Sequence, residues 1–165
     1  MIQKLISFVA YKLIWLSGVW GSTVGIAFLT PILAVMYALY VLRQQSKKGL
    51  FMIYLACITM FGIVLESLVL HKTAYAFTPP RTLIPYWLMA IWVAFPCVCA
   101  TTLKQAIKSP ILAICIGAIF GPLAYQGAAS IGSIELINGA NGLGTLSVVW
   151  GTLLFMIHRW MRLFD

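Results

Sequence analysis

Long apolar runs separated by short polar segments limit the fold of this chain more than any other feature. A membrane-crossing helix needs about 20 mostly apolar residues, and the sequence offers six such runs: 5–20, 24–42, 50–70, 85–103, 110–130 and 143–160. In a bilayer, helices satisfy all of their backbone hydrogen bonds within one segment. The sequence therefore predicts an all-α, polytopic transmembrane bundle that forms a single domain over residues 1–165.

Composition excludes a soluble fold. The chain has 165 residues, of which 62% are hydrophobic and 8% charged, whereas ordinary soluble domains are about half apolar and a quarter charged. A soluble domain of this size could not bury so much apolar surface. In a bilayer the same surface faces lipid.

The first two runs leave one choice open. A single helix over 13–42 would be about 45 Å long, which exceeds the roughly 30 Å hydrocarbon core. We therefore expect two helices, with a turn at Gly21, Ser22 and Thr23. Lys12 interrupts the first run and no small-residue cleavage site follows it, so we expect a retained helix rather than a signal peptide.

The net charge of +8 points to membrane orientation rather than to nucleic acid. Phosphate-binding patches gather on one face or element, but here the basic residues stand between apolar runs. Six helices place Lys72 and Arg81 on one side of the membrane. The opposite side, with both termini, receives Lys4, Arg43, Lys47, Lys48, Lys104, Lys108, Arg159 and Arg162. Basic loops stay in the cytoplasm, so we expect a bacterial inner-membrane protein with both termini cytoplasmic.

Glu66 is the acid that lies within an apolar run, about one turn from its outer end, while Glu135 and Asp165 are expected in solvent. Charged groups inside a span are costly and usually face the bundle interior. Two interpretations remain open. In the first, Glu66 reaches the membrane interface or is a structural tie to Lys72 or Arg81. In the second, it is a carboxylate that exchanges protons or binds a ligand.

Several polar and aromatic residues share the membrane depth of Glu66. At 1.5 Å per helical residue, they occupy the outer half of the bilayer. The candidate polar pocket consists of Glu66, Tyr86, Trp92, Arg81, Tyr125 and Gln126, capped by His71 and Lys72. An interfacial aromatic belt is the alternative explanation for Tyr86 and Trp87.

The fifth run carries a stripe of small residues at helical spacing, which lets helix backbones approach closely. The stripe comprises Gly117, Gly121, Ala124, Ala128 and Gly132. It predicts that this helix is buried centrally or forms a dimer seam. Pro31, Pro96 and Pro122 each remove a backbone donor inside a run, so we expect kinks at these positions.

No cofactor, metal site or catalytic residue is predicted. The chain has no Ser-His-Asp set, HExxH, CxxC or Gly-rich phosphate loop. The four cysteines, Cys57, Cys97, Cys99 and Cys115, all fall in apolar runs and are expected to behave as small core residues.

Two segments carry a resemblance to a known family. They are residues 85–95 (PYWLMAIWVAF) and residues 117–127, with the pattern GxxxGPLAYxG. Over most of its length the chain resembles an uncharacterised bacterial family of small inner-membrane proteins, a domain of unknown function. The resemblance implies an acid in the third helix, usually Asp, where Glu66 stands, and a Trp in the last helix, at Trp150. Lys12 departs from the apolar first helix of the family. The family's genes often lie near those of lipid-modifying enzymes of the cyclopropane-fatty-acid-synthase kind, which implies a membrane-lipid context.

Three functional hypotheses follow. The first is a non-catalytic membrane component in a lipid-related context. The second is a small transporter or lipid-handling carrier that uses the pocket around Glu66. The third is an intramembrane lipid-modifying enzyme, which lacks a partner nucleophile for its single carboxylate. The expected partners are membrane lipids and either a second copy of the chain or another membrane protein.

Overall fold

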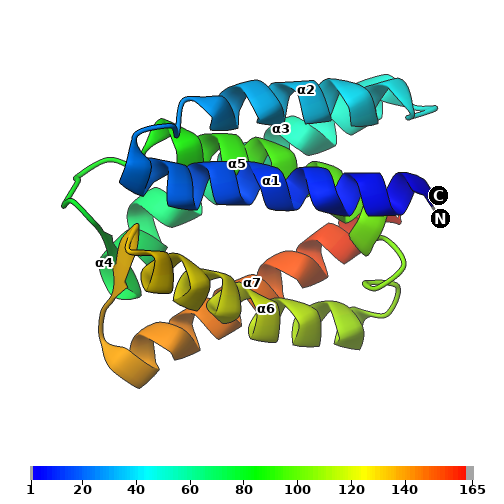
Figure 1. Ribbon diagram of the computed structural model, residues 1–165. Coiled ribbons are helices and arrows are strands. Elements are labelled where there is room, and N and C mark those ends of the chain that lie inside the picture. The colour runs from blue at the N-terminus through cyan, green and yellow to red at the C-terminus, as the bar shows by residue number, and fades with distance from the viewer. Residues whose placement is uncertain (1, 163–165) are drawn as a thin grey trace.

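The computed structural model describes residues 2–162, which form a bundle of six helical segments with a small two-stranded sheet (Figure 1). The segments are α1 (Ile2–Val24), α2 (Leu29–Arg43), α3 (Lys48–Leu65) with η1 (Glu66–Leu70) and α4 (His71–Thr73), α5 (Tyr86–Val98) with η2 (Cys99–Leu103), α6 (Pro110–Ile131) and α7 (Gly139–Met161). The strands are β1 (Tyr75–Phe77) and β2 (Ile134–Leu136). The predicted all-α bundle is confirmed, with six helices close to the expected runs.

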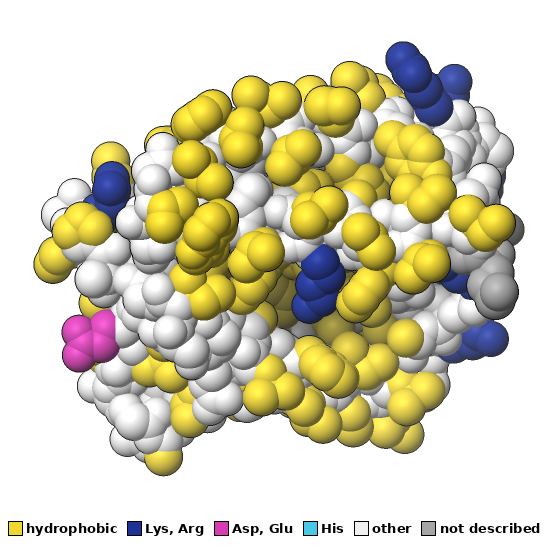
Figure 2. Space-filling view, viewed as in Figure 1, with side chains coloured by type: hydrophobic (Ala, Val, Ile, Leu, Met, Phe, Trp, Pro, Cys, Tyr) yellow, Lys and Arg dark blue, Asp and Glu magenta, His cyan; other side chains and the backbone are white. Residues whose placement is uncertain are grey.

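Five segments are long and apolar enough to cross a membrane, and α2, with 15 residues, is a shorter apolar helix. Large apolar side chains cover the flanks of the bundle (Figure 2). The chain is therefore a multi-pass membrane protein. The two ends of the described chain lie together at one end of the bundle, and the β1–β2 sheet lies at the other (Figure 1).

The first two runs are two helices, but the turn lies later than predicted. Helix α1 continues through Gly21, and the chain reverses after Gly25, whose φ of 86° suits glycine. The hydroxyls of Ser22 and Thr23 bond back to carbonyls three residues earlier, which keeps them within the helix. Gly21 allows the chain after the turn to pack closely on α1, because a Cβ there would lie 3.2 Å from the backbone nitrogen of Ala27.

Helix α5 is the central helix. In the segment formed by α5 and η2, 56% of the residues are buried. In the most apolar stretch of each of the other four candidate spans, the share of buried residues is 28–33%. Of the two alternatives predicted for the fifth run, now α6, central burial therefore does not hold, and a dimer seam stays a prediction. Helices α1, α2 and α3 pack against α5, and its Trp, Phe and Ile side chains are buried along most of its length.

The three prolines have different consequences. Pro96 lies inside α5 and leaves the carbonyl of Trp92 without its helical donor, and the Thr59 hydroxyl of α3 donates to that carbonyl at 3.2 Å. Pro122 lies inside α6. Pro31 is the third residue of α2, where backbone N–H groups have no helical partner, so no mid-helix kink follows there.

The small-residue stripe of α6 divides into three parts. A Cβ at Gly117 would lie 2.1 Å from the carbonyl oxygen of Trp150, and Gly121 also faces Trp150, so these glycines pack against α7. Ala124 and Ala128 face a cavity instead. Gly132 ends α6 in the left-handed conformation, with φ of 91°.

Candidate functional site

The carboxylate of Glu66 is buried inside the bundle and accepts three hydrogen bonds. Oε2 accepts from the Tyr75 hydroxyl at 2.6 Å, and Oε1 accepts from Trp92 Nε1 at 3.2 Å and from the Tyr125 hydroxyl. Glu66 itself is 1% exposed. Three donors directed at one side chain suit an ionised carboxylate, because its oxygens only accept hydrogen bonds.

Four elements bring these groups together: η1, β1, α5 and α6 carry Glu66, Tyr75, Trp92 and Tyr125 in that order. The α-helical path of α3 changes to the π-helical turn η1 at Glu66, a local feature that often accompanies functional sites. Pairing of β1 with β2 fixes Tyr75, which lies opposite Leu136. Gly62 of α3 makes room for the Trp92 indole, since a Cβ there would lie 2.0 Å from the ring.

Within residues 2–162, all recorded partners of Glu66 are neutral. Lys72 and Arg81 are exposed and are not among them. The hypothesis of a structural ion pair between Glu66 and either residue is therefore wrong. Burial, followed by the charge of Glu66, raises the pKa of the Tyr75 hydroxyl well above its usual value, so this phenol stays a neutral donor.

A cavity of about 60 Å³ adjoins the Glu66 carboxylate. Its wall is almost entirely apolar and includes nine aromatic residues: Tyr11, Trp15, Tyr75, Phe77, Trp87, Trp92, Phe95, Tyr125 and Trp150. The rings of Trp92 and Trp150 are stacked with centroids 5.5 Å apart, and Phe95 meets Trp150 edge-on. The indole nitrogen of Trp150 is buried and lies near the Tyr125 hydroxyl, but within the described residues it makes no hydrogen bond of normal geometry.

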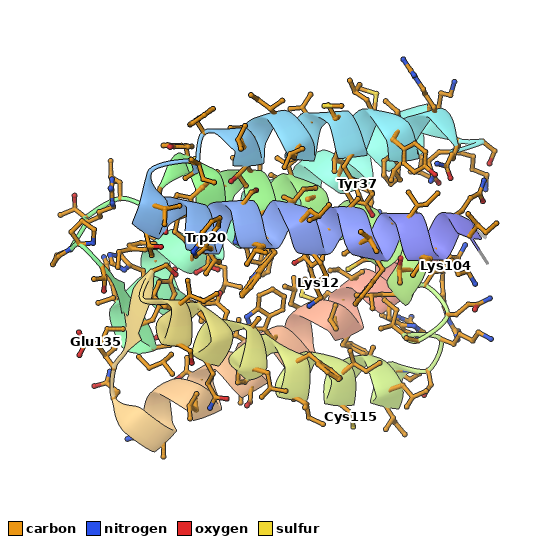
Figure 3. The ribbon with its side chains drawn as sticks, in the orientation of Figure 1. Lys12, Trp20, Tyr37, Lys104, Cys115 and Glu135 are labelled. Atoms are coloured by element: carbon orange, nitrogen blue, oxygen red, sulfur yellow. The ribbon has the colours of Figure 1, made fainter. Side chains whose placement is uncertain are left out.

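The cavity is lined by residues of α1 and α6, and the surface between these two helices is hollowed (Figure 2). A basic side chain stands at the edge of the hollow, where Figure 3 labels Lys12. The Lys12 ammonium lies 5.6 Å from the Phe8 ring centroid, within α1. The position of the hollow puts the cavity within reach of the surrounding lipid.

The structure brings together three of the six residues of the candidate pocket, namely Glu66, Trp92 and Tyr125. The other three, Tyr86, Arg81 and Gln126, are exposed and do not line the cavity. Tyr86 is the first residue of α5 and points outward, while its neighbour Trp87 is buried in the cavity wall. Position along the membrane normal therefore could not show which face of each helix points into the bundle.

Two of the expected caps of the pocket differ in position. His71 packs on the Phe77 ring, with centroids 4.7 Å apart, and its Nε2 lies 2.9 Å from the carbonyl oxygen of Arg81. Lys72 is exposed. Of these two residues, only His71 packs against the cavity wall, through its contact with Phe77.

Sequence reasoning missed Tyr75, Trp15 and Phe95. Tyr75 was assigned to a loop, because the β1–β2 pairing joins segments about 60 residues apart and leaves no local pattern. The one available signal was its position nine residues after Glu66. Trp15 and Phe95 read as ordinary apolar residues of their helices.

Metal ligands are not gathered anywhere in the described part of the chain, which has no group of three or more His, Cys, Asp or Glu side chains suited to an ion. Cys97 and Cys99 are buried in α5 and η2, as expected for core residues. Cys57 and Cys115 instead lie on the exposed apolar surface, which corrects the prediction for these two.

A family model described as a protein of unknown function (DUF2878) matches residues 4–156. The chain belongs to the DUF2878 family. This match confirms the resemblance to an uncharacterised family, and it covers every residue that lines the cavity. No curated protein and no solved structure matches this DUF2878 chain.

Proposed function

We propose that this DUF2878 protein is a non-catalytic inner-membrane protein that binds a lipid-like molecule in the aromatic cavity beside Glu66. The observation that carries the proposal is the cavity itself, which combines an apolar wall with one buried carboxylate. Small-molecule sites are typically concave and mostly apolar, with a few polar groups that orient the ligand.

Two polar groups in the wall favour an amphipathic occupant over a purely apolar one. The Glu66 carboxylate has about four acceptor positions, of which three are used. The Trp150 indole N–H lies near the Tyr125 hydroxyl but makes no hydrogen bond of normal geometry within the described residues. A buried donor without an acceptor costs free energy, so an occupant that carries an oxygen atom would be stabilised there.

The same geometry favours binding over catalysis. The groups around the carboxylate are two phenols and an indole. A lipid-modifying enzyme would need an activated nucleophile or a metal beside the acid. Among residues 2–162, no Ser, Thr, Cys or His donates to or accepts from Glu66.

Filling the cavity should expel its occupant. Ala128 of α6 is 6% exposed and lines the cavity, so Ala128→Leu places three additional carbon atoms in the space. We expect the lipid that co-purifies with the detergent-solubilised protein, counted per chain by mass spectrometry, to fall at least fivefold.

Ala56→Leu is the matched control, because Ala56 is exposed on α3 and does not line the cavity. It should leave the amount of co-purified lipid unchanged. Equal lipid content in both variants would place the lipid on the outer surface and contradict the proposed site.

We propose that the chain ends face the cytoplasm of a bacterial cell. The loops after α2 and η2 lie at the same end of the bundle as the chain ends (Figure 1); they hold Lys47, Lys104 and Lys108, and Lys48 follows at the start of α3. This distribution follows the positive-inside rule. Alkaline phosphatase fused after Asp165 should be inactive, and the same enzyme inserted after Pro80 should be active. The reverse pattern would overturn the orientation.

A further inference from the structure

We infer that the cavity beside Glu66 recognises an organic cation, so that the polar end of its ligand is an ammonium group. This inference rests on the proposed function, because it assigns the ligand class of the same cavity. Two observations support it: a buried carboxylate whose partners are all neutral, and a wall of aromatic rings.

The carboxylate lacks a counter-charge. A buried charge is unfavourable unless it is paired as well as hydrogen-bonded. Tyr75, Trp92 and Tyr125 supply hydrogen bonds to Glu66 but no positive charge. In the described residues no lysine, arginine or histidine lines the cavity. A cationic ligand would supply the missing charge.

The wall offers the surfaces that ammonium groups prefer. A cation is attracted to the face of an aromatic ring, most strongly to Trp, and clusters of such rings recognise quaternary ammonium ligands. Trp15 and Trp87 line the cavity from α1 and α5, and Tyr75 and Tyr125 stand beside the carboxylate. Combined with Glu66, these rings make a site that is both aromatic and anionic.

Lys12 defines the opposing possibility, an anionic ligand. Its ammonium stands at the hollow between α1 and α6 (Figure 3), but it is exposed, lies over the Phe8 ring and does not line the cavity. An anion bound inside would face the Glu66 carboxylate. We therefore assign the interior of the cavity to a cation, and Lys12 serves as the variant that detects an anion.

Three small probes of the same branched shape test the assignment on the full chain in detergent. Choline is the cation, 3,3-dimethyl-1-butanol is its neutral isostere, and 3,3-dimethylbutanoate is an anion of similar size. Titrations followed by tryptophan fluorescence should give a Kd for choline at least tenfold below that of the neutral alcohol. Glu66→Gln should raise the Kd of choline at least tenfold and leave the Kd of 3,3-dimethyl-1-butanol unchanged.

The comparison of probes on the unaltered protein stands even where Glu66→Gln fails to fold. Equal Kd values for choline and its neutral isostere, or no choline binding, would overturn the cation assignment. Tighter binding of the anion, lost in Lys12→Ala, would overturn it in favour of an anionic ligand. The lipid content of Ala128→Leu decides separately whether the cavity binds lipid, so failure of the cation assignment is distinguishable from failure of the proposed function.

Discussion

Gly117→Ala is expected to destabilise the protein by about 3 kcal/mol, at the upper end of the usual cost of overpacking. The added Cβ would lie 2.1 Å from the carbonyl oxygen of Trp150 and 2.6 Å from its carbonyl carbon. Backbone atoms cannot swing aside as a side chain can, so α6 and α7 must separate. These helices form the most extensive pair in the bundle. Thermal unfolding in detergent, monitored by size-exclusion chromatography after each heating step, should show a lower midpoint and more aggregated protein.

The same substitution at Gly144 is the control. Gly144 lies in α7 and is exposed, and a Cβ there would meet no atom within 4 Å. Alanine favours helix over glycine by up to about 1 kcal/mol, so Gly144→Ala should be neutral or slightly stabilising. Equal thermal midpoints for the two variants would show that α6 and α7 do not cross closely at Gly117.

Tyr125→Phe should destabilise the protein by roughly 1.5–3 kcal/mol, the typical value of a hydrogen bond to a charged group. The Tyr125 hydroxyl donates to Glu66 Oε1 from a buried position. Phenylalanine keeps the ring and removes only the donor, which leaves the carboxylate with two recorded hydrogen bonds. The loss should appear as a lower thermal midpoint for the purified protein.

Tyr86→Phe makes the identical chemical change at a tyrosine that is 55% exposed and does not line the cavity. We expect no change in the midpoint. If both variants behave alike, the Tyr125 hydroxyl is not a donor to a buried carboxylate. The three-donor arrangement around Glu66 would be supported if the thermal midpoint falls for Tyr125→Phe and not for Tyr86→Phe. Adding Tyr75→Phe to Tyr125→Phe should then lower the midpoint further.

The sequence predicted the helices well because the bilayer imposes a length and a polarity on each one. The loops at 44–47 and 104–109 and the start of α6 at Pro110 follow directly from that pattern. The burial of Glu66 was also predictable, because its charge has nowhere else to go inside an apolar run. Depth along the membrane correctly grouped Glu66 with Trp92 and Tyr125.

The faces of the helices were not predictable in the same way. A transmembrane helix is apolar on all sides, so the sequence contains little periodicity to separate Tyr86, which is exposed, from Trp87, which is buried. The contribution of Tyr75 depends on strand pairing with β2, a contact between distant segments. The role of α5 as the central helix likewise depends on how the other helices pack around it.

The short helix α2 has a consequence for the membrane around the protein. Its 15 residues extend about 22 Å, less than the roughly 30 Å hydrocarbon core. Its outward side chains, such as Ile32 and Met36, are apolar and exposed, so we expect acyl chains to contact them. Lipids beside α2 must therefore shorten or tilt, a hydrophobic mismatch that thins the bilayer locally. Because the neighbouring α1 has 23 residues, we expect the thinning to be confined to the side of the protein that α2 forms.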